Sequence, residues 1–129
     1  MPAKYLLDAS AVLAMLRKEP GWEVVRDLLP EAQISAVTLV EVLTKAIQKG
    51  VPPEDAAQAL RDIGLPVLPV HEGHAYASAA VAPLAWKAGL SLADRLCITM
   101  ATTHNLAAVT SDKSWASLRL KGLAVKLIR

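Results

Sequence analysis

The opening segment most constrains the fold of this chain, because a short apolar run there ends on a carboxylate and leads directly into helical spacing. The run Tyr5–Leu7 is followed by Asp8, and apolar residues then recur at Val12, Leu13 and Leu16. This pattern predicts a buried strand followed by a helix. A carboxylate at the C-terminal end of a first central strand lies where open α/β sheets bind their ligands. Any other acidic residue that reaches the same edge is therefore a candidate partner for Asp8.

Strand-like and helix-like segments alternate along the rest of the chain, with Gly and Pro between them. We expect further strands at residues 33–37, 65–70, 106–110 and 124–128, the second of these at a sheet edge because it contains two prolines. We expect helices at residues 10–18, 22–29, 38–48, 53–63, 71–88 and 91–104, with a kink at Pro83 and a turn or short helix at 112–118. This order predicts an α/β fold with a mostly parallel sheet and helices on both faces. The pattern alone leaves the strand order open.

Size and composition restrict the class of protein. The 129 residues fit one domain, 1–129. A composition of 53% hydrophobic and 20% charged residues excludes disordered and collagen-like chains. No apolar run reaches the ~18 residues of a membrane span, and Asp8 interrupts the first apolar stretch, so neither an anchor nor a signal peptide is expected. A single Cys indicates a reducing, cytoplasmic location. The net charge of +2 is compatible with a polyanionic partner.

Three further acidic residues are expected at the same sheet edge as Asp8. Glu41 is predicted in the first turn of the helix after the second strand, and Asp94 in the first turn of the helix that leads into the fourth strand. Asp112 follows the fourth strand, directly after Thr110 and Ser111. Because strand C-termini and helix N-termini meet at one edge of a parallel sheet, the four carboxylates are expected to converge.

Helix capping is the alternative explanation for each of these acids. Residues 38–41 have the form of a capping box and residues 91–94 a related form, while Asp8 and Asp112 could cap the helices that they precede. As a group, however, unit charges ~5 Å apart at an effective dielectric of ~20 repel by about 3 kcal/mol per pair. Such a cluster needs protons or a cation, and hard oxygen ligands suit Mg²⁺ or Mn²⁺. An ion of this kind can generate a hydroxide-like nucleophile for phosphodiester hydrolysis.

The same four segments resemble the signature segments of the PIN domain, and their order and the chain length resemble the VapC toxins of toxin–antitoxin pairs. The segments are residues 7–11 (LDASA), 38–42 (TLVEV), 89–94 (GLSLAD) and 109–112 (VTSD). The resemblance implies a five-stranded parallel sheet of order 3-2-1-4-5 and a Mg²⁺- or Mn²⁺-dependent endoribonuclease. It implies an acidic site, which is also the metal site, formed by Asp8, Glu41, Asp94 and Asp112. Ser10 and Thr110 match small hydroxyl positions that help to orient ligands.

The resemblance also implies partners. These are single-stranded or loop RNA as substrate, an antitoxin that covers the acidic groove, and a homodimer formed through the helices around residues 22–29 and 75–86. Two alternatives remain open: a catalytically silent domain that binds RNA or protein, and a PIN ribonuclease with a housekeeping role. The intact set of four acids favours an active enzyme over a silent domain.

Five basic residues lie in or near the segments that flank the acidic edge, and they could hold phosphates on either side of a metal ion. A solvated surface is the alternative for each of them. They are Arg17, Lys18, Lys45, Arg95 and Lys113. Arg95 also stands where relatives often carry a small residue.

The remaining residues with functional potential are expected to be structural. His71 and His74 can share a helical face, but no second pair of soft ligands accompanies them, so surface or capping roles are expected rather than zinc binding. Cys97 lies on an apolar stripe and is predicted to be a core thiol. The three tryptophans are expected in the core or an interface rather than stacked on bases: Trp22, Trp86 and Trp115.

Overall fold

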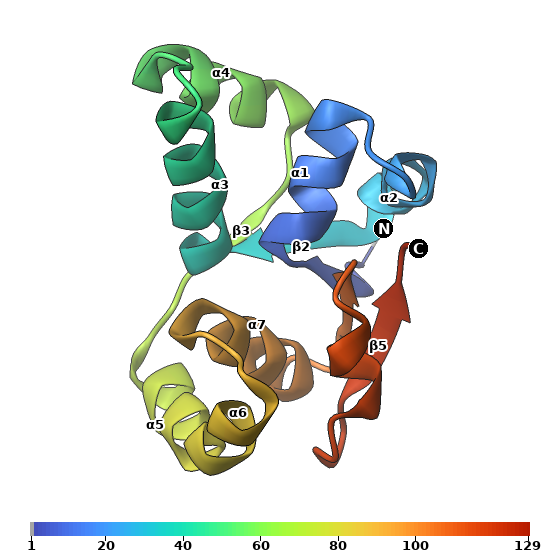
Figure 1. Ribbon diagram of the computed structural model, residues 1–129, viewed down its shortest axis with the longest axis vertical. Helices are drawn as coiled ribbons and strands as arrows, with labels where there is room; N and C mark the ends of the chain where they lie inside the picture. The colour runs from blue at the N-terminus through green and yellow to red at the C-terminus, as the bar shows by residue number, and fades with distance from the viewer. Residues whose placement is uncertain (1) are drawn as a thin grey trace.

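Five short parallel strands lie side by side in the order β3-β2-β1-β4-β5, which confirms the order implied by the resemblance (Figure 1). The computed structural model describes residues 2–129. The strands are β1 (Tyr5–Leu7), β2 (Ala32–Ser35), β3 (Val67–Leu68), β4 (Ala107–Thr110) and β5 (Ala124–Leu127). The α-helices are α1 (Ala9–Arg17), α2 (Trp22–Leu28), α3 (Ala36–Gln48), α4 (Pro53–Ile63), α5 (Glu72–Ala80), α6 (Ala82–Ala88) and α7 (Leu92–Thr103). Two 3₁₀ segments, η1 (Leu29–Glu31) and η2 (Lys113–Ser117), complete the chain.

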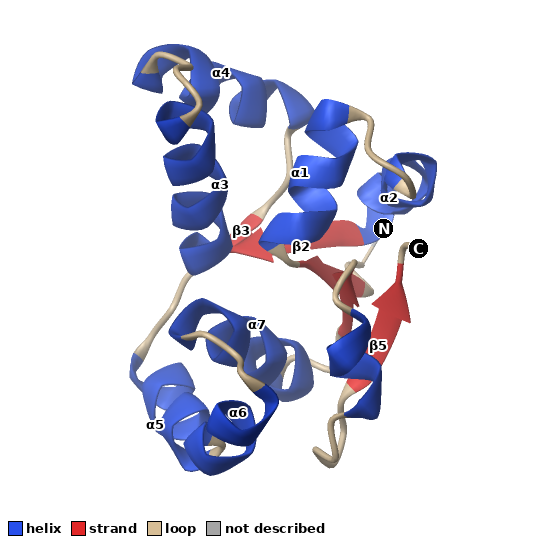
Figure 2. Cartoon of the chain, viewed as in Figure 1, coloured by secondary structure: helices blue, strands red, loops and turns tan. Residues whose placement is uncertain are grey.

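The sheet separates two hydrophobic cores, because successive side chains of a strand point to opposite faces. In β1, Leu7 packs with Val12 of α1 and Val42 of α3 on one face. Leu6 packs with Ile98 of α7 and Trp115 of η2 on the other. Helices therefore cover both faces of the sheet, as the alternating pattern predicts (Figure 2).

Two of the predicted helices differ from the structure by more than one residue at an end. Helix α3 begins at Ala36 rather than at residue 38, because the hydroxyl of Ser35 caps it by accepting the main-chain N–H of Thr38. Glu41 consequently lies in the second turn of α3, so the predicted first-turn position is wrong and the alternative capping box at residues 38–41 is not formed. The helix predicted at 71–88 is divided into α5 and α6, with Pro83 in the first turn of α6, where a missing N–H breaks no helical bond.

Strand β3 has only two residues and lies at the sheet edge, as the flanking prolines predict. Pro66 and Pro69 stand on either side of it and have no N–H to donate. The carbonyl of Pro66 still accepts the N–H of Ile34 in the neighbouring strand, at 3.0 Å.

The tryptophans have different environments. Trp115 is fully buried, and Trp22 is partly buried, with Lys18 and Arg26 over its ring. Trp86 is 72% exposed, so it does not belong to the core of this chain. Cys97 is buried, which confirms the prediction of a core thiol.

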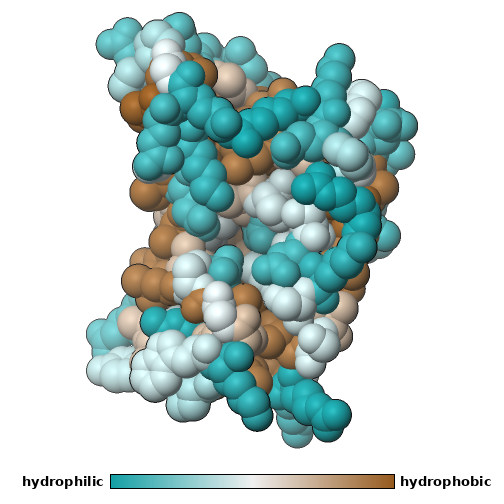
Figure 3. All heavy atoms as spheres, in the orientation of Figure 1, coloured by the Kyte–Doolittle hydropathy of each residue, from teal (hydrophilic) through white to brown (hydrophobic). Residues whose placement is uncertain are grey.

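Polar side chains cover most of the face seen in Figure 3, and apolar side chains reach the surface between α3 and α5. Exposed apolar residues of the chain include Val67, Val70 and Leu92. Among residues 2–129, no helix is both long enough and apolar enough to span a bilayer.

Candidate active site

Asp8 lies at the junction of β1 and α1 and is the most buried of the four candidate acids, at 7% exposure. Its Oδ1 caps α1 by accepting the main-chain N–H groups of Ser10 and Ala11, and it also accepts the Ser10 hydroxyl at 2.7 Å. Its Oδ2 accepts the hydroxyl of Thr110 at 2.7 Å. Burial nevertheless raises the pKa of Asp8, although these hydrogen bonds act in the opposite direction. The carboxylate is thus held rigidly in a place where its charge is poorly solvated.

A hydroxyl network joins the end of β4 to the end of β1. Thr110 Oγ1 lies 3.2 Å from Ser10 Oγ and accepts the main-chain N–H of Asp112 at 3.0 Å. Ser10 Oγ accepts the N–H of Ser111 at 3.0 Å. Ser10 and Thr110, the two supporting residues expected from the sequence, therefore lie in direct contact with Asp8 and connect it to the Asp112 backbone.

Glu41 and Asp94 come from helices on opposite faces of the sheet, α3 and α7. Burial raises the pKa of Glu41; the positive charge of Lys45 lowers it, and the negative charges of Asp94 and Asp8 raise it again. Asp94 and Asp8 are therefore close enough to Glu41 for their charges to act on it. Asp94 also forms the capping box expected for α7, since its Oδ2 accepts the Ser91 N–H and its own N–H donates to Ser91 Oγ. Capping and clustering are thus compatible for this residue.

Asp112 joins the site through its backbone more than through its side chain. Its carboxylate is exposed and caps η2, with Oδ1 accepting the N–H of Ser114 at 2.9 Å and the Ser114 hydroxyl at 2.7 Å. Its main-chain N–H donates to Thr110 in the network around Asp8. The predicted cap is confirmed, and the backbone hydrogen bond to Thr110 is the contact that links Asp112 to the network around Asp8.

A buried thiol lies beneath these acids. Burial raises the pKa of Cys97 well above its ordinary value, and the charges of Asp8, Asp94 and Glu41 raise it further. The sequence predicts a core position for Cys97 but contains no sign that it faces the acidic edge.

The donor set fits a hard divalent cation. All four candidate side chains offer carboxylate oxygens. The repulsion from Asp94 and Asp8 raises the pKa of Glu41, and a cation placed between the carboxylates would reduce this repulsion. Within residues 2–129, no three of these carboxylates have oxygens all within 4.8 Å of one another. Mutual repulsion favours such spacing in the absence of a counter-ion.

The five basic candidates are distributed unevenly around this edge. Lys45 acts electrostatically on Glu41, one helical turn away, and Lys113 directly follows Asp112. Arg95 is half-buried and directs its guanidinium to the carbonyl of Ser78 in α5, at 3.5 Å.

Arg17 and Lys18 are not brought to the acidic edge. Both stand at the C-terminal end of α1, about 13 Å along the helix axis from the Asp8 cap at 1.5 Å per residue. The ammonium group of Lys18 lies 5.5 Å from the ring centroid of Trp22, so this residue packs at the opposite end of the helix.

Residues 5–120 match the model of the PIN domain family. The chain is a member of the PIN domain family. The comparison with curated proteins finds no significant sequence match. The parallel sheet of order 3-2-1-4-5 is the order that the resemblance to this family implies.

Solved structures of toxin–antitoxin proteins have the same fold as this PIN domain. DNA-bound VapBC from Salmonella typhimurium matches with a TM-score of 0.77 at 19% identity, covering 98% of this chain and 99% of that one. A toxin–antitoxin complex from Klebsiella pneumoniae matches with a TM-score of 0.75 at 19% identity, covering 98% of each chain. VapBC-5 from Mycobacterium tuberculosis matches with a TM-score of 0.62 at 23% identity, covering 99% of each chain. At these identities the likeness concerns the fold.

Proposed function

We propose that this PIN domain is a metal-dependent endoribonuclease that hydrolyses phosphodiester bonds in single-stranded or loop RNA and serves as the toxin of a toxin–antitoxin pair. One observation carries the proposal: the negative charges of Asp94 and Asp8, which come from two other elements, both raise the pKa of Glu41. Carboxylates gathered from distant parts of a chain raise the free energy of the fold, and a bound cation is the simplest compensation.

Each residue has a defined part in this proposal. Asp8, Glu41, Asp94 and Asp112 hold Mg²⁺, with Mn²⁺ as an alternative. The bound ion supplies a more acidic water and neutralises charge that develops on the phosphate. Ser10 and Thr110 fix the orientation of Asp8 through their hydrogen bonds to its two oxygens.

Three of the basic residues remain in the proposal as RNA contacts because they lie near the acids. Lys45 and Lys113 are exposed and can bind phosphates by charge. Arg95 takes this part only if its guanidinium leaves the Ser78 carbonyl. Arg17 and Lys18 would contact only RNA that extends to the far end of α1.

An antitoxin is proposed because the solved structures with this fold include toxin–antitoxin complexes. An apolar hollow of about 300 Å³ lies between α3 and α4 and is lined in part by Leu39, Leu43 and Leu60. Leu39 and Leu43 are each two positions from Glu41, about 200° around α3, so an antitoxin segment that fills the hollow would cross over α3 to cover the acids. A homodimer is proposed through the region of α5 and α6, where Tyr76 and Trp86 are 70% and 72% exposed.

Cleavage of total RNA and transfer RNA by the purified chain tests the activity. We expect discrete fragments with Mg²⁺ or Mn²⁺, none with EDTA, and none from Asp8→Asn or Asp94→Asn. Asp55→Asn is the matched control, because Asp55 is an exposed acid in the first turn of α4. This variant should cleave RNA as the parent does. Cleavage that persists in both folded site variants would refute the assigned acids. No cleavage by a folded, metal-binding parent would favour the silent binding domain.

Expression in a bacterial host separates a toxin from a housekeeping ribonuclease. A toxin should arrest growth, and the Asp8→Asn variant should not. Rescue by the product of a neighbouring gene for a short DNA-binding protein would support the antitoxin. Normal growth while the active enzyme accumulates would contradict the toxin role and leave the nuclease intact.

A further inference from the structure

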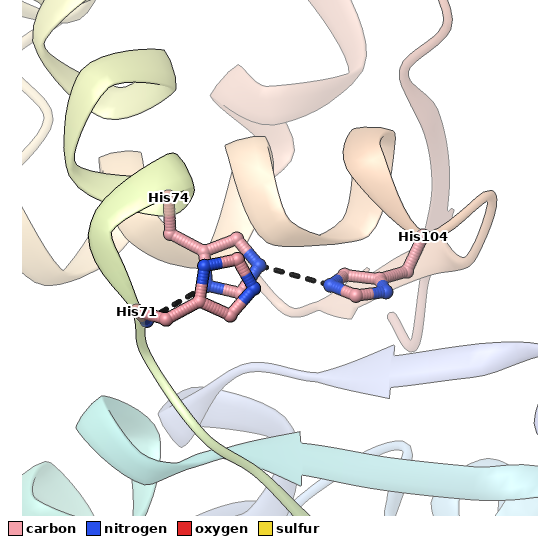
Figure 4. A group of neighbouring side chains, drawn as sticks. All are labelled: His71, His74 and His104. Carbon is pink, nitrogen blue, oxygen red and sulfur yellow. Dashed lines mark hydrogen bonds between the residues drawn. The ribbon is translucent and has the colours of Figure 1, made fainter.

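All three histidines of the chain meet at one place outside the acidic edge (Figure 4). His71 caps the N-terminus of α5, His74 lies in the first turn of that helix, and His104 caps the C-terminus of α7. One nitrogen from each imidazole lies within 4.8 Å of the other two. Among the described residues, this is the one group of three or more His, Cys, Asp or Glu side chains with ligand atoms so close together.

His74 is the central member and is 1% exposed. Its Nδ1 accepts the main-chain N–H of His71 at 3.2 Å, and its Nε2 lies 2.9 Å from Nε2 of His104. The hydrogen bonds assign the neutral His74 proton to Nε2, from which it is donated to His104. Burial lowers the pKa of His74, and His71 and His104 lower it further, so the ring is held in its neutral form.

The outer two rings are accessible. His71 and His104 are exposed, and the His71 ring stacks on His74 with centroids 3.8 Å apart and planes inclined by 26°. Gly73 leaves room for this ring, because a Cβ at that position would lie 3.3 Å from Cε1 of His71. The cluster therefore has one fixed buried ring, with two surface rings through which solvent and ions can reach it.

We propose that His71, His74 and His104 form a second metal site, which binds a borderline transition-metal dication such as Zn²⁺ and is chemically distinct from the acidic edge. Neutral imidazole nitrogens suit Zn²⁺, Co²⁺ and Ni²⁺, whereas Mg²⁺ and Mn²⁺ favour oxygen ligands. Three protein ligands with an accessible side leave the fourth tetrahedral position to water. The ion would tie the start of α5 to the end of α7, whose other end carries Asp94.

Modest rearrangements convert the metal-free cluster into such a site. Zn–N bonds of about 2.0–2.1 Å place two tetrahedral ligand nitrogens about 3.3 Å apart, so the Nε2 atoms of His74 and His104 separate by a few tenths of an ångström. His71 rotates out of the stack to direct a nitrogen at the ion, which its surface position permits. The proton of His74 moves from Nε2 to Nδ1. The metal thus replaces the hydrogen bond between His74 and His104. The new His74 Nδ1–H faces the main-chain N–H of His71, so the backbone at His71 shifts with its side chain and both donors take other acceptors.

Metal binding by the untagged chain tests the proposal, with Mg²⁺ in excess to occupy oxygen sites. Zn²⁺ should bind with one ion per chain by calorimetry, and Co²⁺ should show the visible absorption of a tetrahedral complex. Nitrogen-detected NMR of the imidazoles should show the His74 proton change from Nε2 to Nδ1. His104→Gln should weaken Zn²⁺ binding at least about tenfold, because loss of even an outer-sphere partner commonly reduces metal affinity by about 10–100-fold.

Two variants make the result decisive. His71→Gln changes an exposed ligand and provides a second measurement of Zn²⁺ affinity if His104→Gln disturbs the end of α7. Asp8→Asn should bind Zn²⁺ as the parent does, which separates this site from the proposed nuclease centre. Loss of Zn²⁺ binding in Asp8→Asn, or unchanged binding in folded His104→Gln and His71→Gln, would overturn the proposal. So would a parent that binds no Zn²⁺ and keeps the His74 proton on Nε2, which would mean that the three rings serve only as helix caps.

Discussion

Removal of the Asp8 charge with retention of its hydrogen bonds should abolish metal-dependent cleavage and leave a domain at least as stable as the parent. In Asp8→Asn, the remaining side-chain oxygen still accepts the N–H groups of Ser10 and Ala11 and so preserves the cap of α1. The new amide group can donate to Thr110 Oγ1, and the Thr110 hydroxyl can then donate to Ser10 Oγ, 3.2 Å away. The network reverses direction and keeps both hydroxyls paired, while the second N–H of the amide donates to water or to another acceptor at the acidic edge.

Asp8→Ala keeps none of these bonds and is the informative comparison. Loss of the cap costs about 0.5–2 kcal/mol. The Ser10 and Thr110 hydroxyls both lose Asp8 as their acceptor, and because only one of them can donate to the other, the second is left unpaired at a cost of about 1–3 kcal/mol. We therefore expect Asp8→Ala to be about 2–4 kcal/mol less stable than Asp8→Asn at pH 7. For a domain of this size, that difference lowers Tm by roughly 10 °C.

The dependence on pH identifies the charge as the cause. Burial raises the pKa of Asp8 in the folded protein above its ordinary value of 3.8, so the folded state binds this proton more tightly than the unfolded state. The ionised side chain therefore destabilises the fold above the folded-state pKa, and this penalty disappears as pH falls below 3.8. The advantage of Asp8→Asn over the parent should be largest at neutral pH and should shrink toward pH 4.

Urea unfolding of the parent, Asp8→Asn and Asp8→Ala in EDTA, at a series of pH values, measures these differences. An Asn variant as unstable as the Ala variant at pH 7 would show that the network does not reverse as described. A difference between Asn and the parent that does not change with pH would refute the link between burial and the raised pKa of Asp8.

Four further substitutions at three positions test other contacts. Thr110→Val removes the hydroxyl that Asp8 accepts, and it should cost about 1–3 kcal/mol in urea unfolding and lower cleavage. Gly21→Ala should lower Tm and leave Mg²⁺ affinity unchanged, because a Cβ at this φ of +93° would lie within 3 Å of the Ile128 carbonyl. Trp115→Ala should cost about 3–5 kcal/mol, as a large core side chain is lost. Trp115→Phe should cost clearly less, because the Trp115 Nε1–H is buried without a partner in the described chain; equal losses from Ala and Phe would contradict this.

Local patterns determined most of the fold and part of the acidic site. The alternation of strands and helices, the caps by Asp8 and Asp112, and the capping box of Asp94 all depend on residues only a few positions apart. Such short-range rules can be read in one sequence. Because the strands are parallel, these caps all lie at the C-terminal edge of the sheet.

Contacts between distant segments were decided only by the tertiary structure. The sequence predicts Glu41 in the first turn of its helix, with a capping box as the alternative, whereas Ser35 starts the helix earlier and places Glu41 in the second turn, where the charges of Asp94 and Asp8 act on it. The proximity of residues 17 and 18 to Asp8 along the chain indicates nothing about distance, because α1 separates them by its full length.

The histidines show the same limit most clearly. His71 and His74 are close in sequence, but the third imidazole, His104, follows thirty residues after His74 and ends a different helix. Their contact depends on the packing of α5 against α7, which local propensity does not encode. The physical reason is that caps and periodicity are interactions within one turn or strand, whereas sites are formed by side chains that the burial of separate apolar faces brings together.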